Sequence, residues 1–328
     1  MRTCALWSDQ RGAKLFRSLA ELLSLALILE ASGYPKPGNV HRISDGAGLR
    51  YEAFLATGVF ALKYFELGIK RGYRGVGKLT VGDLIYGLVS EVISRTKSSN
   101  TCLGSSLLLS LMSVSLGKCI KCRPRGLEDL VAASREIVEL TTEWDAVYYY
   151  RAIRRASPSY IKPEDNTAEY VNVWDRAYRK HLVEKRQRLV DVLRYSSKFD
   201  VVAREAVSGF AQGLTYEEFL RQRLLSHGDI NRAIVETYLY ILSLNIDTVV
   251  LLKHGERVAT EISRKAKQVL DNLVKASENW MPPVLELDVE LRSRGVNPGA
   301  VADIVAETIA LHLIRNVLEG REPLELSH

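Results

Sequence analysis

The stretch Leu15–Gly33, LFRSLAELLSLALILEASG, is the clearest structural signal in the chain. Its apolar residues recur at intervals of three and four positions, at Leu15, Leu19, Leu22, Leu23, Ala26 and Leu27. This spacing places them along one face of an α-helix, and a glycine such as Gly33 is a typical residue at a helix end. The stretch therefore predicts a long amphipathic helix that packs against a core.

The same periodicity recurs along the rest of the chain, whereas the alternation typical of strands is scarce. We predict further helices over 51–71, 80–95, 102–116, 127–141, 200–211, 230–244, 248–254, 257–276 and 299–318. The best strand candidate is short, Pro283–Val289 (PVLELDV), and the polar segment Ser157–Glu169 is the best candidate for a long loop. We therefore predict an all-α protein in which residues 1–328 form a single compact domain of about ten helices.

Composition limits the partners that the protein can have. The chain has 328 residues and a net charge of +6, which suits a polyphosphate ligand but also suits basic proteins without one. The basic residues are mixed with acidic ones, which places nucleic acid below a polyphosphate as a partner. The apolar runs Leu22–Leu29 and Leu107–Leu116 are shorter than the ~20 residues of a membrane span, and the N-terminus does not resemble a signal peptide. We expect a cytoplasmic protein that does not bind membranes. The protein could form a homodimer.

Two near-motifs lack an essential part. The pair Cys119 and Cys122 (CIKC) has no second Cys or His pair at matching spacing, so we expect buried thiols or a disulfide rather than a zinc site. The stretch Gly72–Thr80 (GYRGVGKLT) resembles a P-loop, but Leu79 stands where the motif needs Ser or Thr to hold magnesium. We expect a basic loop between helices there.

The turn PKPGN places Lys36 between two prolines and before Gly38 and Asn39. Proline fixes φ and so leaves little backbone entropy to lose. A solvated loop lysine is the simpler interpretation, and a charge positioned for a phosphate is the alternative that we favour.

Three predicted helix starts share one design. Asn100 or Thr101 can cap one helix, Asn297 can cap another in which Gly299 keeps the first turn bare, and Asp247 can cap a third. Such starts leave backbone N–H groups open to an anion, although ordinary capping explains each one alone. Asp303 lies four residues after Gly299, where a carboxylate could hold a cation beside a bound phosphate.

Five motifs now carry a resemblance to a known family. PKPGNV, DGAG near Asp45, SNTCLG, DTVVLLKHG and NPGAVADI occur in this order, between about Glu21 and Ile314. In this order they resemble the triphosphoribosyl-dephospho-CoA synthase family. The resemblance implies an all-α fold and a reaction in which the 2′-hydroxyl of dephospho-CoA attacks the anomeric carbon of the ribose of ATP. Adenine leaves, and the triphosphate stays on the transferred ribose.

Within that family the chain is more similar to an archaeal-type branch. Cys102 and Leu103 stand where the bacterial enzymes carry His and Lys, and Val249 replaces an Asn. The stretches VYYYRAIRRASPSY (Val147–Tyr160) and YSSKFDVVAREAVSGF (Tyr195–Phe210) also resemble that branch. These changes leave the acceptor and the donor open.

Taken with the motifs, the resemblance implies a Mg²⁺-dependent enzyme that binds ATP and dephospho-CoA. An oxocarbenium-like transition state would need nearby carboxylates. The predicted magnesium ligands are Asp247 and Asp303, and the predicted acid–base or stabilising residues are Asp200, Glu205 and His254. The predicted substrate- and phosphate-binding residues are Lys36, Gly38, Asn39, Arg42, Asn100, Thr101, Gly104, Lys253, Asn297 and Gly299. A non-catalytic nucleotide- or cofactor-binding protein, or a ribosyl transferase that acts on another cofactor precursor, are the alternatives.

Overall fold

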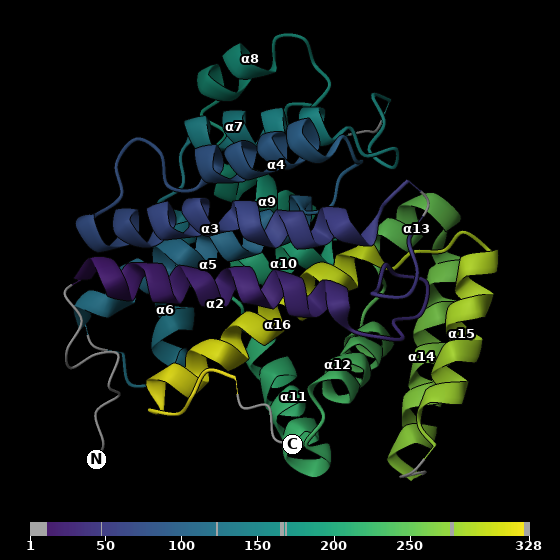
Figure 1. Ribbon diagram of the computed structural model, residues 1–328. Helices are drawn as coiled ribbons and strands as arrows, with labels where there is room; N and C mark the ends of the chain where they lie inside the picture. Colours follow the sequence, from purple (N-terminus) through teal and green to yellow (C-terminus); the bar gives the residue numbers. More distant parts are fainter. Residues whose placement is uncertain are drawn as a thin grey trace.

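The computed structural model describes residues 12–46, 48–122, 124–164, 167, 169–275 and 279–324. Within those ranges it has fifteen helices and, apart from two isolated bridges, no β-structure (Figure 1). The helices are α2 (Gly12–Ser32), α3 (Tyr51–Arg74), α4 (Gly82–Thr96), α5 (Leu103–Cys122), α6 (Leu127–Glu139), α7 (Glu143–Ala156), α8 (Tyr178–Glu184), α9 (Leu189–Ser196), α10 (Val201–Ser208), α11 (Gly213–His227), α12 (Ile230–Leu244), α13 (Thr248–His254), α14 (Glu256–Lys275), α15 (Met281–Ser293) and α16 (Gly299–Leu318). The all-α prediction is confirmed.

The predicted number of about ten helices was too low. All the predicted helices are present, but α7, α8, α9, α11 and α15 were missed. With 7 and 8 residues, α8 and α9 are too short to show periodicity. The strand prediction at Pro283–Val289 was wrong, because these residues lie in α15. Its prolines stand in the first turn, where their missing N–H groups have no intrahelical partner to lose.

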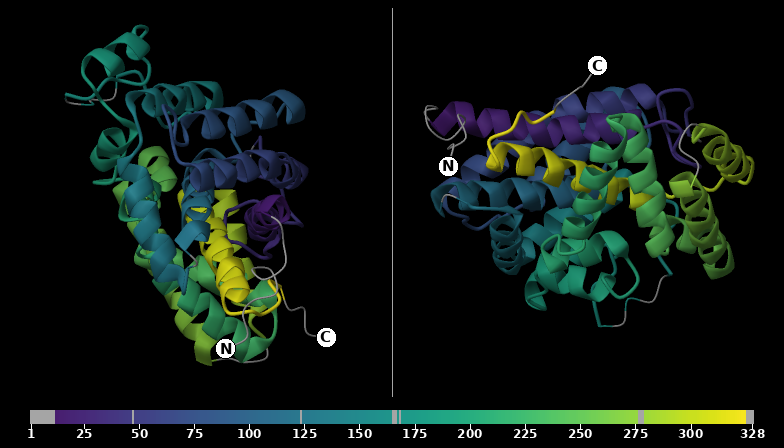
Figure 2. Two further views of the ribbon diagram at one scale, coloured as in Figure 1. Left: turned by 90° about the vertical axis from the view of Figure 1, so that its left-hand side faces the viewer. Right: turned by 90° about the horizontal axis from the view of Figure 1, so that it is seen from below.

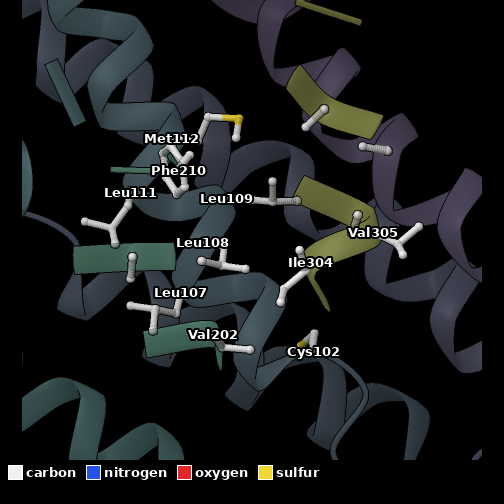
Figure 3. Close-up of a cluster of buried hydrophobic side chains, with 14 of the residues drawn as sticks. Cys102, Leu107, Leu108, Leu109, Leu111, Met112, Val202, Phe210, Ile304 and Val305 are labelled. Atoms are coloured by element: carbon white, nitrogen blue, oxygen red, sulfur yellow. The ribbon is translucent and has the colours of Figure 1, made fainter. Parts of the chain in front are cut away.

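The core is built around α5. Leu107, Leu108, Leu109 and Leu111 are all buried and point toward different neighbours, which include α10 and α16 (Figure 3). A helix that is apolar on every side belongs in a core or a membrane. By length and composition α5 could span a membrane, but 83% of its most apolar window is buried inside the fold. It is therefore the central helix of one hydrophobic cluster to which helices from α2 to α16 contribute.

The described residues contain no strand before the P-loop-like stretch and no group of metal ligands at the CIKC pair. Gly72 belongs to α3, and the backbone N–H of Thr80 donates to Asp145 at 2.9 Å. Cys119 is buried and Cys122 is exposed, and both are free thiols. The expectation of buried thiols is therefore met by Cys119 but not by Cys122, and no disulfide joins the two.

The loop from α2 to α3 is anchored by α15. Asp288 accepts the N–H of Gly38 at 2.8 Å and contacts His41 at 3.2 Å. Arg292 donates to the backbone oxygens of Asn39 and Asp45. Figures 1 and 2 show α14 and α15 side by side at one edge of the molecule. That edge holds the PKPGN turn in place.

Candidate functional site

One cavity of about 340 Å³ lies where the N-termini of α5 and α16 meet. The end of α2, part of α3, α13 and the segment after α7 complete its wall. Seven of the predicted site residues line it: Asn39, Asn100, Thr101, Lys253, Asn297, Gly299 and Asp303. Residues from both ends of the chain and from its middle therefore converge on one site.

The N-terminus of α5 forms one side of the cavity. Asn100 Oδ1 accepts the N–H groups of Cys102 at 3.1 Å and Leu103 at 2.9 Å, so Asn100 caps this helix. The hydroxyl of Thr101 lies 2.9 Å from that of Thr57. The side chains that sequence analysis assigned to phosphate binding thus also order the start of α5.

Asp303 reaches across from α16 to the same helix start. Its Oδ1 accepts the N–H of Ser105 at 2.8 Å. A Cβ atom on Gly104 would overlap its Oδ2, so only glycine allows this approach. Burial raises the pKa of Asp303 to about 8, and the N–H bond from Ser105 opposes that rise. Asp303 therefore places a buried carboxyl group with a raised pKa in the cavity wall.

The N-terminus of α16 presents a donor and an acceptor. Asn39 Nδ2 donates to Asn297 Oδ1 at 3.1 Å and to the carbonyl of Pro298 at 3.2 Å. Because a carbonyl only accepts, these bonds fix the orientation of both amides. The side-chain Oδ1 of Asn39 accepts no hydrogen bond from the described residues, and the Nδ2 of Asn297 donates none to them. They are available to a polar ligand.

Asp247 lies beneath this site and does not line the cavity. Its Oδ1 accepts the N–H of Val250 at 2.9 Å, and its Oδ2 accepts the N–H of Val301 at 2.8 Å. Burial raises its pKa to about 6, and these N–H groups oppose the rise. The predicted magnesium ligand thus caps α13 and joins it to α16.

Three further predicted phosphate-binding residues stand outside the cavity. Lys36 has no exposed surface and forms an ion pair with Glu30, which does line the cavity. Gly38 has φ +73°, and a Cβ atom there would overlap the carbonyl of Val296. Arg42 is exposed, with its guanidinium 5.7 Å from the centre of the Tyr34 ring. The PKPGN turn therefore shapes the wall behind the cavity, and Asn39 is its residue inside.

Lys253 is the one Lys or Arg among the described residues that line the cavity. Its ammonium lies 5.6 Å from the centre of the ring of Tyr160, which belongs to the segment after α7. His254 follows it at the end of α13 but does not line the cavity, and its buried Nε2 has no hydrogen-bond partner in the described part of the chain. Lys253 is thus the cation best placed for a phosphate.

The two acids of the central motif face other helices. Asp200 caps α10 by accepting the N–H of Val202 at 3.1 Å, and the hydroxyl of Thr248 donates to it at 3.2 Å. Glu205 is buried beside Glu307 of α16. Burial raises the pKa of Glu205 to about 7 and that of Glu307 well above its usual value, and the charge of Glu205 adds to the rise at Glu307. Neither central acid lines the cavity.

The cavity suits a magnesium ion only in company with a ligand. No group of three or more His, Cys, Asp or Glu that could hold a metal exists in the ranges that the structure describes. The cavity has two carboxylates, Glu30 and Asp303. Magnesium usually binds proteins through one or two carboxylates together with water and phosphate oxygens. Asp303 fits that role.

Sequence analysis missed several residues of the cavity. Glu30 stands six positions before Lys36, and no local pattern shows that it faces a cavity. The segment from Ser157 to Tyr160 was predicted as part of a loop and of a family-like stretch, without a site role, yet it forms a continuous part of the wall. Phe54 lines the cavity from α3. Their positions depend on packing between helices that are distant in sequence.

Comparisons with known proteins give a consistent result. A family model described as ATP:dephospho-CoA triphosphoribosyl transferase matches residues 16–322. A Pseudomonas fluorescens protein named "Probable 2-(5''-triphosphoribosyl)-3'-dephosphocoenzyme-A synthase" is 32% identical over 114 residues. The match covers 34% of this chain and 39% of that relative, so the chain spans well under half of the curated relative.

A solved structure supports the fold. It is the crystal structure of an Archaeoglobus fulgidus protein that is provisionally named as a triphosphoribosyl-dephospho-CoA synthase. The two structures superpose with a TM-score of 0.59 at 24% sequence identity, over 78% of this chain and 96% of the other. The helical architecture is therefore shared with the Archaeoglobus fulgidus protein.

Proposed function

Because this chain belongs to the CitG family of ATP:dephospho-CoA triphosphoribosyl transferases, we propose that it transfers the triphosphoribosyl group of ATP to the 2′-hydroxyl of 3′-dephospho-CoA. Adenine is the leaving group. The observation that carries the proposal is the single cavity in which Asn39, Asn100, Lys253, Asn297 and Asp303 meet. They come from four of the five motifs that resemble the family.

The chemistry asks three things of the cavity. It must hold a triphosphate, orient two riboses and stabilise positive charge at the anomeric carbon as the bond to adenine breaks. Lys253 and the N-termini of α5 and α16 suit the phosphates. Asp303 and Glu30 are carboxylates of the cavity wall that could face the anomeric carbon. Asn39 and Asn297 offer an acceptor and a donor side by side, an arrangement that suits a polar edge such as that of adenine.

We propose that magnesium enters with ATP and is held by Asp303. The ion would neutralise part of the phosphate charge, which the one cavity cation, Lys253, leaves largely unbalanced. A cytoplasmic location fits a biosynthetic enzyme that uses these two soluble substrates, and it stays a prediction.

Adenine release tests the proposal. The purified protein is incubated with Mg²⁺-ATP and dephospho-CoA, free adenine is measured by chromatography, and the joined product is identified by mass. We expect adenine only when both substrates are present, and much less of it with Asp303→Asn when ATP is below saturation. Asp271→Asn makes the same change on the exposed surface of α14 and should be fully active.

The alternatives predict other results. Adenine release only with a different acceptor would identify a ribosyl transferase for another cofactor precursor. Tight Mg²⁺-ATP binding without adenine release from any acceptor would identify a nucleotide-binding protein.

A further inference from the structure

A buried ion pair stands in the wall of the cavity. Glu30, in the last turn of α2, lines the cavity and is 6% exposed. Lys36 lies behind it, is 0% exposed, and its ammonium contacts Glu30 Oε1. No hydrogen bond from the described residues reaches Glu30 Oε2. One carboxylate oxygen is therefore held by the protein, and the other is available to a ligand.

Burying these two charges destabilises the fold, so their presence in the wall calls for a reason other than stability. Removing a lysine and a glutamate from water carries a large desolvation penalty, and two apolar side chains of similar size are often at least as stable. Burial raises the pKa of Glu30, the ammonium of Lys36 opposes that rise, and burial lowers the pKa of Lys36. A wall that only closed the cavity would have no need of this pair.

The turn around Lys36 is held from several sides. Pro35 and Pro37 fix φ on both sides of it. The hydroxyl of Tyr238, itself fully buried, donates to the carbonyl of Pro37 at 2.8 Å. Asn231 of α12 accepts the N–H of Tyr34 at 2.8 Å and donates to its carbonyl at 2.6 Å. The lysine therefore reaches Glu30 from a rigid base.

We propose that Glu30 is a catalytic residue of the transfer and that Lys36 is the residue that positions it. The inference rests on the proposed function. Glu30 Oε2 accepts the proton of the dephospho-CoA 2′-hydroxyl as that oxygen attacks C1′ of the ATP ribose. This assignment gives the lysine of the PKPGN turn a role without any contact with phosphate.

The step balances without a further reactant. The O–H bond breaks, the bond from oxygen to C1′ forms, and the bond from C1′ to N9 breaks with its electron pair going to adenine. The proton leaves Glu30 to solvent, and the departing adenine takes one proton from solvent. Overall one proton moves from the hydroxyl to adenine.

The first test separates catalysis from binding. A general base typically contributes a factor of 10² to 10⁴ in rate, so Glu30→Gln should lower kcat about a hundredfold or more. Its Kd for Mg²⁺-ATP should stay within about threefold of the wild type, because Asp303 remains. Glu21→Gln, an exposed change on the same helix, should leave kcat unchanged.

The second test addresses Lys36. Lys36→Met should lower kcat and move the acidic limb of the kcat/KM profile to higher pH, because Glu30 would ionise later without its ammonium partner. Among the described residues, Asp303, Arg292 and Tyr238 also interact electrostatically with the pair, and none of them is changed. The double variant Glu30→Gln/Lys36→Met removes both charges. It should melt close to the wild type and be as inactive as Glu30→Gln, which excludes misfolding as the cause.

Each contrary result would overturn a different part of the inference. If the wild type is active and Glu30→Gln keeps more than about a third of that activity, the catalytic role is overturned and the proposed function stands. Unchanged kcat with weakened Mg²⁺-ATP binding in Glu30→Gln would make Glu30 a ligand of the metal instead. An unshifted pH limb in Lys36→Met would reject the positioning role. A wild type that releases no adenine with any acceptor would overturn the inference together with the proposed function.

Discussion

A single glycine decides where Asp303 can stand. With Gly104 in the first turn of α5, the carboxylate approaches the helix start and accepts the N–H of Ser105. An anion is favoured at such a position because the orphan N–H groups and the helix dipole both point at it. The fold therefore holds Oδ1 of Asp303 through this N–H and places Oδ2 against Gly104.

Asp303→Asn should therefore weaken Mg²⁺-ATP binding about tenfold or more, or on the order of 1.4 kcal/mol. The amide oxygen can still accept the N–H of Ser105, so we expect the melting temperature to change little. Calorimetric titration beside a melting curve measures both, with Asp271→Asn as the control. Unchanged affinity in the variant would remove Asp303 from the site.

Asp247 shows how one side chain joins two elements. It accepts one N–H within α13 and one from α16, and it is buried. Asp229 is a matched case, because it also accepts two backbone N–H groups, those of Asn231 and Arg232, but it is exposed and serves α12 alone.

Removing the buried cap should cost more than removing the exposed one. Asp247→Ala leaves two buried N–H groups unpaired and should lower the free energy of unfolding by roughly 2–4 kcal/mol. Asp229→Ala should cost about 1 kcal/mol, the usual loss of an N-cap. Urea unfolding of the two variants gives the comparison, and equal losses would contradict the joint role of Asp247.

The packing of α3 on α5 depends on glycines. A Cβ atom on Gly72 would overlap the carbonyl of Val114, and one on Gly117 would overlap the carbonyl of Ile69. Backbone atoms cannot move aside as the ends of side chains can, so the two helices would have to separate.

Gly117→Ala should therefore destabilise the protein by roughly 2 kcal/mol or more, in spite of the better helix propensity of alanine. Gly77→Ala, at a loop position with no atom near its Cβ, should change stability by less than about 0.5 kcal/mol. Thermal unfolding of both variants measures the difference. An unchanged melting temperature for Gly117→Ala would contradict the close contact between α3 and α5.

At the scale of the whole molecule, the Glu205 and Glu307 pair ties stability to pH. The pair joins α10 to α16, with Arg204 and Tyr216 as the nearest other titratable groups. The pKa of Glu205 rises from 4.5 to about 7 on folding, so between these values the folded state holds a proton that the unfolded state has lost. The contribution of the pair is present below about pH 4.5 and is lost as pH rises through about 7. Asp247 and Asp303 shift in the same direction.

The wild type should therefore become less stable between pH 5 and pH 8. Glu307→Gln keeps a hydrogen bond to Glu205 without a second charge, so it should raise stability at pH 8 by roughly 1–3 kcal/mol and flatten the pH dependence. Glu128→Gln, an exposed change on α6, should follow the wild type. Melting curves across this range measure the effect. A variant less stable than the wild type at pH 8 would contradict the idea that the pair is stable only while it holds a proton.

The all-α fold class follows from patterns that are local in the sequence. Periodic apolar positions such as Leu15 to Leu27 specify which face of a helix is buried, and that signal is local. Local pattern also identified the caps of α5 and α13, because a capping side chain bonds within a few residues. The cap predicted for α16 was wrong: Pro298 is its N-cap, and Asn297 makes no cap bond. Short helices such as α8 and α9 escaped, since one or two turns show no period.

Which of the predicted site residues lie together depends on how distant helices pack. Lys36 looked like a free cation and is buried behind Glu30. Glu205 looked like a site acid and pairs with Glu307, a residue from the far end of the chain. Such outcomes depend on which helix faces pack together, and that is settled by the total burial of apolar surface over the whole chain. No local pattern contains that sum, so the cavity and its charges could be read only from the packed molecule.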